Sequence, residues 1–75
     1  MNYYVLIYHR EDGRVMDVEN FSAAAPAALA RRFELDRTYA DDADVEVVLL
    51  AAESEEALHR THSRYFKSVK DLVAG

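Results

Sequence analysis

The chain has no cysteine, and only two glycines and one proline among its 75 residues. Without cysteine it can have no disulfide, no thiolate nucleophile and no cysteine-ligated zinc site. The glycines, Gly13 and Gly75, are too few and too far apart for a glycine-rich phosphate-binding loop, and no serine stands in a nucleophile-elbow motif. The sequence therefore shows none of the parts of a hydrolase or a nucleotide-dependent enzyme.

Long apolar runs and an excess of positive charge are also absent. No apolar run reaches the ~20 residues that a membrane span needs. The first four residues lead directly into an apolar segment without the basic start of a signal peptide, so we expect a cytoplasmic protein. The formal net charge of −5 disfavours contact with a nucleic-acid backbone, because phosphate neutralisation dominates such binding.

What is present suits one small folded domain, residues 1–75. Half of the residues are apolar (51%), which is typical of a folded chain rather than a disordered one. A chain of this length buries only about 60% of the surface that its unfolded form exposes, so its core is small.

Two segments rich in β-formers open the chain, residues 3–10 and 15–21. The Asp-Gly pair at 12–13 lies between them and predicts a two-residue hairpin turn. In that register Ile7 opposes Val18 on the face of the core. The opposite face of the hairpin is then half apolar and strongly aromatic.

The rest of the chain predicts a helix, a strand and a second helix. Residues 26–39 are rich in helix formers and begin with proline, which a first turn accommodates. Residues 44–52 are nearly continuously apolar, which is typical of a strand that contacts protein on both faces. Ser54 is a good N-cap, followed by two glutamates, and the helix after it should run to about Leu72.

The predicted fold is therefore an α+β two-layer sandwich with the element order ββαβα. A right-handed crossover through the first helix makes the second and third strands parallel to each other. We expect a three-stranded sheet in the order 2-1-3. Both helices are expected to cover one face of it, which leaves the aromatic face without cover from its own chain.

Two histidines, His59 and His62, lie three residues apart on the predicted second helix. A metal site would need a third ligand, and the candidate is His9. The helix rises only about 10 Å by His62, whereas His9 lies roughly 20 Å along its strand, so we expect neither a metal nor a cofactor. Two interpretations stay open: a packed histidine with a satisfied hydrogen bond, or a ligand or proton-transfer pocket of His62 and Tyr65.

The first helix has a polar pair, Arg32 and Asp36, inside the apolar arc that contains Leu29 and Phe33. Their spacing of four allows a direct ion pair at the helix margin, with the arginine stem covering apolar surface. Alternatively, the pair is reserved for a partner or ligand, close to the histidine helix. That alternative gives one candidate binding site, formed by His59, His62, Tyr65, Arg32 and Asp36.

The chain opens with "YYVLIYHREDGRV" and later contains "DVEVVLLAAESEEALHRTHSRYF". With these two stretches it resembles a group of short uncharacterised bacterial proteins that share a domain of unknown function. The ββα beginning is similar to the first part of HicB-type antitoxins, which implies an antitoxin-like or nucleic-acid accessory role. The proline and Gly-Cys motif of that group is replaced here by "ENFSAAAP".

Three hypotheses for function follow. The first is a non-enzymatic homodimer, an interaction or regulatory module whose open sheet faces associate. Its predicted interface residues are Tyr4, Leu6, Tyr8, Phe21, Val48 and Leu50. The second is a small-molecule-binding protein or enzyme that uses the candidate binding site. The third is a nucleic-acid accessory protein, which would bind in a salt-sensitive way. Its contacts would come from Arg60, Arg64, Lys67 and Lys70.

Overall fold

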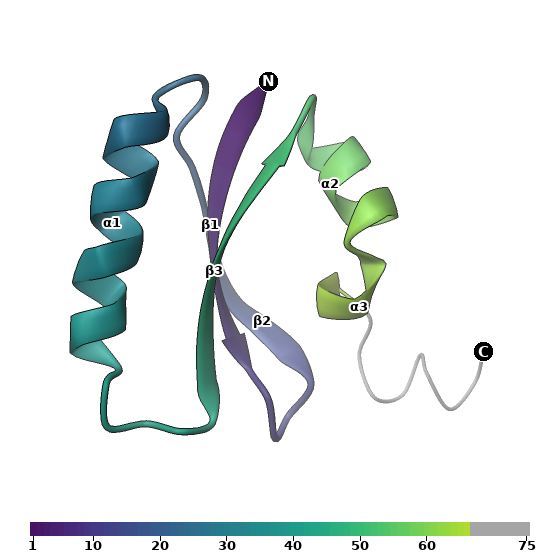
Figure 1. Ribbon diagram of the computed structural model, residues 1–75. Coiled ribbons are helices and arrows are strands. Elements are labelled where there is room, and N and C mark those ends of the chain that lie inside the picture. Colours follow the sequence, from purple (N-terminus) through teal and green to yellow (C-terminus); the bar gives the residue numbers. More distant parts are fainter. Residues whose placement is uncertain (67–75) are drawn as a thin grey trace, which may run out of the picture.

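The computed structural model describes residues 1–66, which form a three-stranded sheet with helices (Figure 1). The elements are β1 Asn2–His9, β2 Arg14–Asn20, α1 Ala25–Thr38, β3 Val45–Ala52, α2 Glu55–Thr61 and α3 Ser63–Phe66. The strand order is β2-β1-β3, and β1 is antiparallel to both neighbours. Strands β2 and β3 are therefore parallel to each other. The predicted α+β class, element order and strand order are confirmed.

The helices lie on opposite faces of the sheet, so the molecule has three layers (Figure 1). One core cluster joins β1 to α1 through Val5, Ile7, Ala28 and Leu35. The other joins the sheet to α2 and α3 through Tyr4, Leu6, Ala52, Leu58 and Tyr65. The prediction that both helices share one face is wrong. Both sets of alternating side chains on β1 are apolar, and one helix on each face removes both from water.

The hairpin turn is longer than predicted, and this changes the register of β2. Residues 10–13 form a four-residue turn, and Gly13 at φ 66° takes the left-handed conformation that glycine adopts without a steric penalty. Together with a β-bulge in β2, this turn places Leu6, not Ile7, opposite Val18. A slip of one residue transfers every side chain of a strand to the other face, so Val18 packs beneath α2 and α3.

A β-bulge causes this slip of one residue, because the longer turn alone shifts the register by two and keeps each side chain on its predicted face. The ladder shifts between Ile7 and Tyr8, where Met16 is the extra residue. Val15 and Val18 are three residues apart, yet both pack against the cluster under α2 and α3. Met16 itself is about half exposed (48%).

The last helical segment is broken in two. Ser54 caps α2 as predicted, because its Oγ accepts a hydrogen bond from the N–H of Ala57 at 3.1 Å. Helix α2 ends at Thr61, and His62 leaves helical geometry at φ −120° and ψ 41° before α3 begins. The prediction of one continuous helix is therefore wrong within residues 55–66. Its predicted end at Leu72 lies outside the described residues.

Replacing Leu58 tests whether α2 is packed on the sheet. The side chain is 0% exposed and sits in the core cluster. We expect Leu58→Ala to lower the free energy of unfolding by about 2–5 kcal/mol, measured by urea denaturation. The matched control Met16→Ala, at a site on β2 that is 48% exposed, should lower it by less than about 1 kcal/mol. Equal losses in the two variants would contradict the placement of α2.

Candidate functional site

The five residues of the candidate binding site do not come together. Arg32 and Asp36 belong to α1, whereas His59 lies on α2, His62 follows it and Tyr65 lies on α3. The two groups are separated by the sheet, because α1 and the pair α2–α3 cover opposite faces (Figure 1). The helix-to-helix seam on which this site depended is absent.

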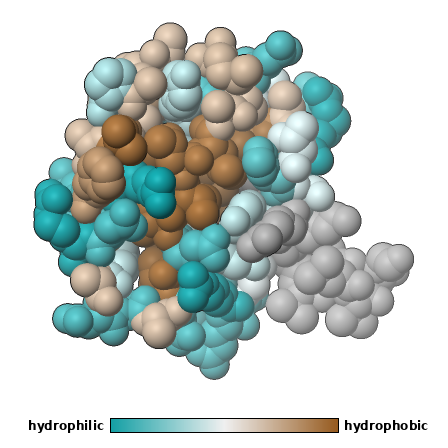
Figure 2. Space-filling view, viewed as in Figure 1, coloured by the Kyte–Doolittle hydropathy of each residue, from teal (hydrophilic) through white to brown (hydrophobic). Residues whose placement is uncertain are grey.

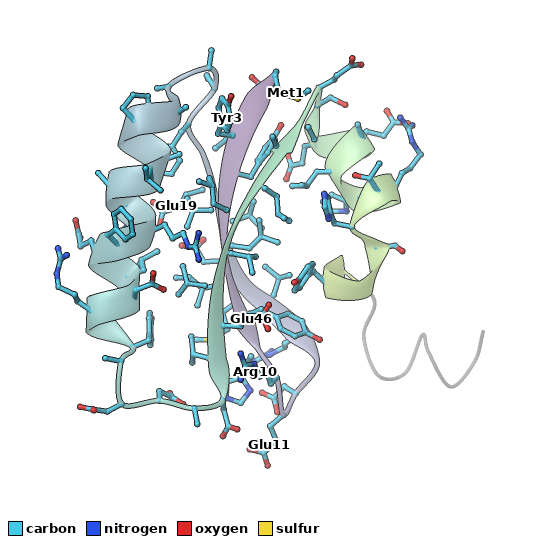
Figure 3. The ribbon with its side chains drawn as sticks, viewed as in Figure 1. Met1, Tyr3, Arg10, Glu11, Glu19 and Glu46 are labelled. Atoms are coloured by element: carbon cyan, nitrogen blue, oxygen red, sulfur yellow. The ribbon has the colours of Figure 1, made fainter. Side chains whose placement is uncertain are left out.

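Tyr65 ties α3 to the sheet. Its side chain is buried, and its ring meets that of Tyr8 edge-on with 5.0 Å between centroids. Its hydroxyl donates a hydrogen bond to Oε2 of Glu46 at 2.9 Å. Arg10 donates from Nε to the other carboxylate oxygen of Glu46 at 3.3 Å, and Figure 3 shows Arg10 and Glu46 near the same end of the sheet. Tyr65 thus has a structural role.

The histidines make local contacts in their own segment. The backbone N–H of His62 donates to the carbonyl of Leu58 at 2.9 Å, and its own carbonyl accepts from the N–H of Tyr65 at 3.1 Å. His59 lies 4.0 Å from Glu55, and its side chain is about half exposed. Among residues 1–66, no three His, Cys, Asp or Glu side chains are grouped so that they could hold a metal ion.

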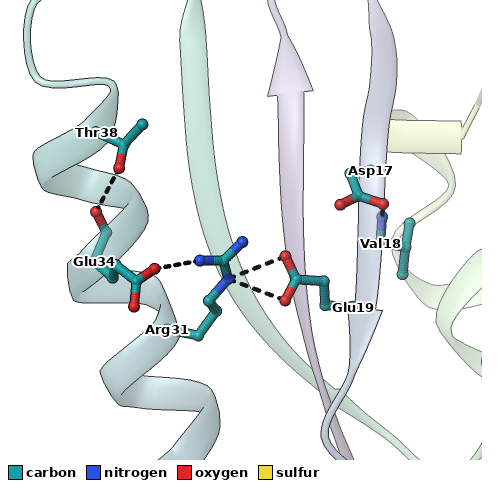
Figure 4. A network of polar contacts seen from close by, with 6 residues as sticks. All are labelled: Asp17, Val18, Glu19, Arg31, Glu34 and Thr38. Atoms are coloured by element: carbon teal, nitrogen blue, oxygen red, sulfur yellow. Dashed lines mark hydrogen bonds and ion pairs between the residues drawn. The ribbon is translucent and has the colours of Figure 1, made fainter.

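A second polar tie holds α1 to β2, and it was not predicted (Figure 4). Nε of Arg31 donates to both carboxylate oxygens of Glu19, at 3.0 and 3.1 Å, and Nη1 donates to Glu34. The hydrogen bond that Arg31 donates to Glu19 is the main cause of the raised pKa of Arg31. The predicted register of β2 placed Glu19 on the face opposite α1, so the sequence analysis did not pair it with Arg31.

The predicted interface residues are divided between the two cores. Tyr4 and Leu6 are 1% and 0% exposed within their own chain. Tyr8, Val48 and Leu50 pack against the same cluster, whereas Phe21 packs against the cluster beneath α1. The aromatic face that was expected to be open is therefore covered by α2 and α3 of the same chain.

The apolar side chains that do reach solvent on α1 point to one side of the sheet. Leu29 and Phe33 are 41% and 52% exposed, whereas Ala28 and Leu35 are buried against the sheet. At about 100° per residue, Arg31 lies about 60° to one side of Ala28, and Leu29 and Phe33 lie about 100° and 140° to the other. Arg31 bonds Glu19 of β2, which is one edge strand of the sheet. The opposite flank of α1 therefore faces the other edge, which β3 forms.

The outer edge of β3 has backbone groups without a strand partner in residues 1–66. The N–H of Arg10 donates to the carbonyl of Asp44 at 2.7 Å, so the backbone groups of Asp44 face β1. Backbone direction alternates along a strand, so those of Val47, Leu49 and Ala51 face outward. These three residues, with Leu29 and Phe33 of α1, are called the edge surface below. Figure 2, viewed towards β3, shows hydrophobic residues gathered in the middle of this side.

The other edge of the sheet is different in kind. Strand β2 has a bulge and carries Arg14, Asp17 and Glu19. Bulges and charged side chains are the usual features that stop an edge strand from pairing with another chain. Strand β3 has eight residues with neither a bulge against β1 nor a lysine, glycine or proline. Its single charged side chain, Glu46, is bonded to Arg10 and Tyr65.

Arg32 lies on the flank of α1 that faces the β3 edge. Its Nε is buried and has no hydrogen-bond partner among the described residues. The nearest carboxylate oxygen, Oδ2 of Asp36, is 3.8 Å away, which is an ion pair but too long for a hydrogen bond. Arg32 and Asp36 are both partly exposed.

The basic side of the last helical segment is described only in part. Arg60 donates from Nη1 to Glu56 at 3.2 Å, and both side chains are largely exposed. Lys67 and Lys70 lie outside the described residues. Within residues 1–66, none of the helices has the length and apolar character that crossing a membrane requires.

The chain was compared with family models, with curated proteins and with solved structures, and nothing in the three comparisons matches it.

Removing the hydroxyl of Tyr65 tests its structural role. Tyr65→Phe keeps the ring contact with Tyr8 but loses the hydrogen bond to Glu46. We expect a loss of about 1 kcal/mol in the free energy of unfolding, measured by urea denaturation. In a Glu46→Gln background the same change should cost less, because the two groups are coupled. An equal loss of unfolding free energy in both backgrounds would show that the hydroxyl is stabilised mainly by a group other than Glu46.

Proposed function

We propose that this protein is a non-enzymatic, cytoplasmic interaction module of one domain, and that it binds a protein partner through the edge surface. The observation that supports this most directly is β3 itself, an edge strand of eight residues, of which all but one are apolar. Long, flat, apolar edges are rare in proteins that remain alone, because they template pairing with another chain.

The edge surface offers a partner two kinds of contact. Outward backbone N–H and C=O groups of Val47, Leu49 and Ala51 accept an additional strand, whose main-chain hydrogen bonds supply affinity. Side chains of Leu29 and Phe33 stand beside that strand and supply apolar area at the level of α1. A partner that covers both would bury the surface that the chain leaves to water.

The pattern of β3 favours the same conclusion. A nearly continuous apolar run is typical of a strand inside a sheet rather than at its edge. Here α1 and α2 cover its two faces, but the flank opposite β1 is unpaired within residues 1–66, and Val45 to Leu50 all remain partly exposed. A partner strand gives this segment the surroundings that its composition suits.

Affinity capture with edge variants tests the proposed function. Leu49→Pro removes one outward N–H, and proline is tolerated at an edge because that N–H does not bond β1. We expect wild-type bait to retain a protein, a second copy included, that Leu49→Pro bait retains at least about tenfold less, measured by quantitative mass spectrometry.

The control is Met16→Glu, which changes an exposed apolar residue on the bulge of the opposite edge strand. It should retain as much partner as wild type, and circular dichroism should show both variants folded. Captured proteins that are equally abundant on all three baits would contradict a role for β3.

A further inference from the structure

We infer that the partner at the edge surface is a second copy of this chain, bound by antiparallel pairing of β3 with β3. This inference rests on the proposed function and names its partner. Two antiparallel strands are related by a dyad perpendicular to the sheet, so the result is a continuous six-stranded sheet in the order β2-β1-β3-β3-β1-β2. In such a dimer both copies of α1 lie on the same face.

The distances across that dyad suit helix packing. Helix α1 contacts both β3 and β1, so its axis lies over the space between them. Neighbouring strands are about 4.8 Å apart, which puts the axis about 5 Å from a dyad beside β3. The two copies of α1 are then about 10 Å apart, within the range at which packed helices lie. Pairing of the strands therefore brings the helices into contact without any rearrangement.

The flank of α1 that would meet its copy is the one with exposed apolar side chains. Leu29 and Phe33 lie opposite the Arg31 flank, on the side of the β3 edge. An extended peptide from another protein would cover the edge of β3 but stand in the sheet layer, below these side chains. A second copy brings its own helix to the same level and covers both layers at once.

Charge on this flank is complementary to itself. Arg32 and Asp36 lie four residues apart, and a dyad beside residue 34 places each Arg32 opposite Asp36 of the other copy. Phe33 lies next to that dyad, so its ring meets the same ring of the second copy. The partly exposed guanidinium of Arg32 gains a carboxylate acceptor from the other copy.

The other face of the sheet leaves room for this pairing. Helix α2 follows directly after the end of β3 at Ala52 and packs near that end of the strand. Antiparallel pairing reverses the second strand, so the two copies of α2 lie over opposite ends of the joined β3 strands. The helices that cover this face therefore stay apart.

Sedimentation of the full chain across the micromolar range tests the inference. Wild type should shift from the mass of one chain to twice that mass as concentration rises. Phe33→Glu brings two carboxylates together at the dyad and should weaken self-association at least about tenfold, as should Leu29→Glu. The control Met16→Glu, an equally exposed apolar position on β2, should leave the dissociation constant unchanged.

Mixing two charge variants separates a contact between copies from the ion pair within one helix. Arg32→Asp leaves two aspartates on the flank, and Asp36→Arg leaves two arginines. Each alone should self-associate about tenfold more weakly than wild type, and an equimolar mixture should regain the wild-type dissociation constant by forming a heterodimer. A role confined to one helix predicts no recovery on mixing.

The outcomes distinguish this inference from the proposed function. A wild-type chain that is monomeric throughout, yet captures a different protein in a manner that Leu49→Pro abolishes, overturns self-pairing and leaves the interaction role intact. A dimer that neither Phe33→Glu nor mixing affects also overturns the inference, since another surface then forms it. Absence of both dimer and edge-dependent capture removes the proposed function as well.

Discussion

The structure depends on burying β1 from both sides. Its alternating side chains are apolar in both directions, with Tyr4 and Leu6 on one face and Val5 and Ile7 on the other. A chain without disulfides and with a small core gains most by covering each face with a helix. The crossover α1 covers one face, and α2 with α3 covers the other. The positions of all other elements follow from this arrangement around a central strand.

Two polar ties hold these helices in place at the margin of the apolar cores. Glu19 of β2 accepts both Nε hydrogen bonds of Arg31 on α1, and Glu46 of β3 accepts from Tyr65 on α3. Both carboxylates keep some contact with water, so neither carries the large desolvation cost of a buried charge. The ties orient the layers, while the apolar contacts supply the stability.

The same arrangement leaves the two sheet edges unlike each other. At β2 the bulge at Met16 and a charged sequence oppose pairing with another chain, whereas β3 is regular and apolar. A protein under pressure to remain single would protect both edges in the same way. In the interaction that we propose, recognition therefore lies on the β3 side, where the exposed flank of α1 adds Leu29, Phe33 and the Arg32–Asp36 pair.

Local patterns in the sequence determined the elements. Alternation of β-formers gave the strands, proline before a run of helix formers gave the start of α1, and Ser54 gave the cap of α2. The hairpin placed β2 beside β1, and the crossover through α1 made β3 parallel to β2. These features depend on neighbours within a few residues, so the sequence alone carries them.

Only the tertiary structure decided the faces. A turn of four residues in place of two shifts the register of β2 by two residues, and the bulge at Met16 reduces this shift to one. That net slip of one residue moves Val18 to one face and Glu19 to the other. The same is true of α2 and α3, whose apolar arc fits either side of a sheet that is apolar on both. The residues of the candidate binding site are divided for this reason, since Arg32 and Tyr65 belong to helices on opposite faces of the sheet. Which face a helix covers is set by the sum of all apolar contacts, and no local pattern records that sum.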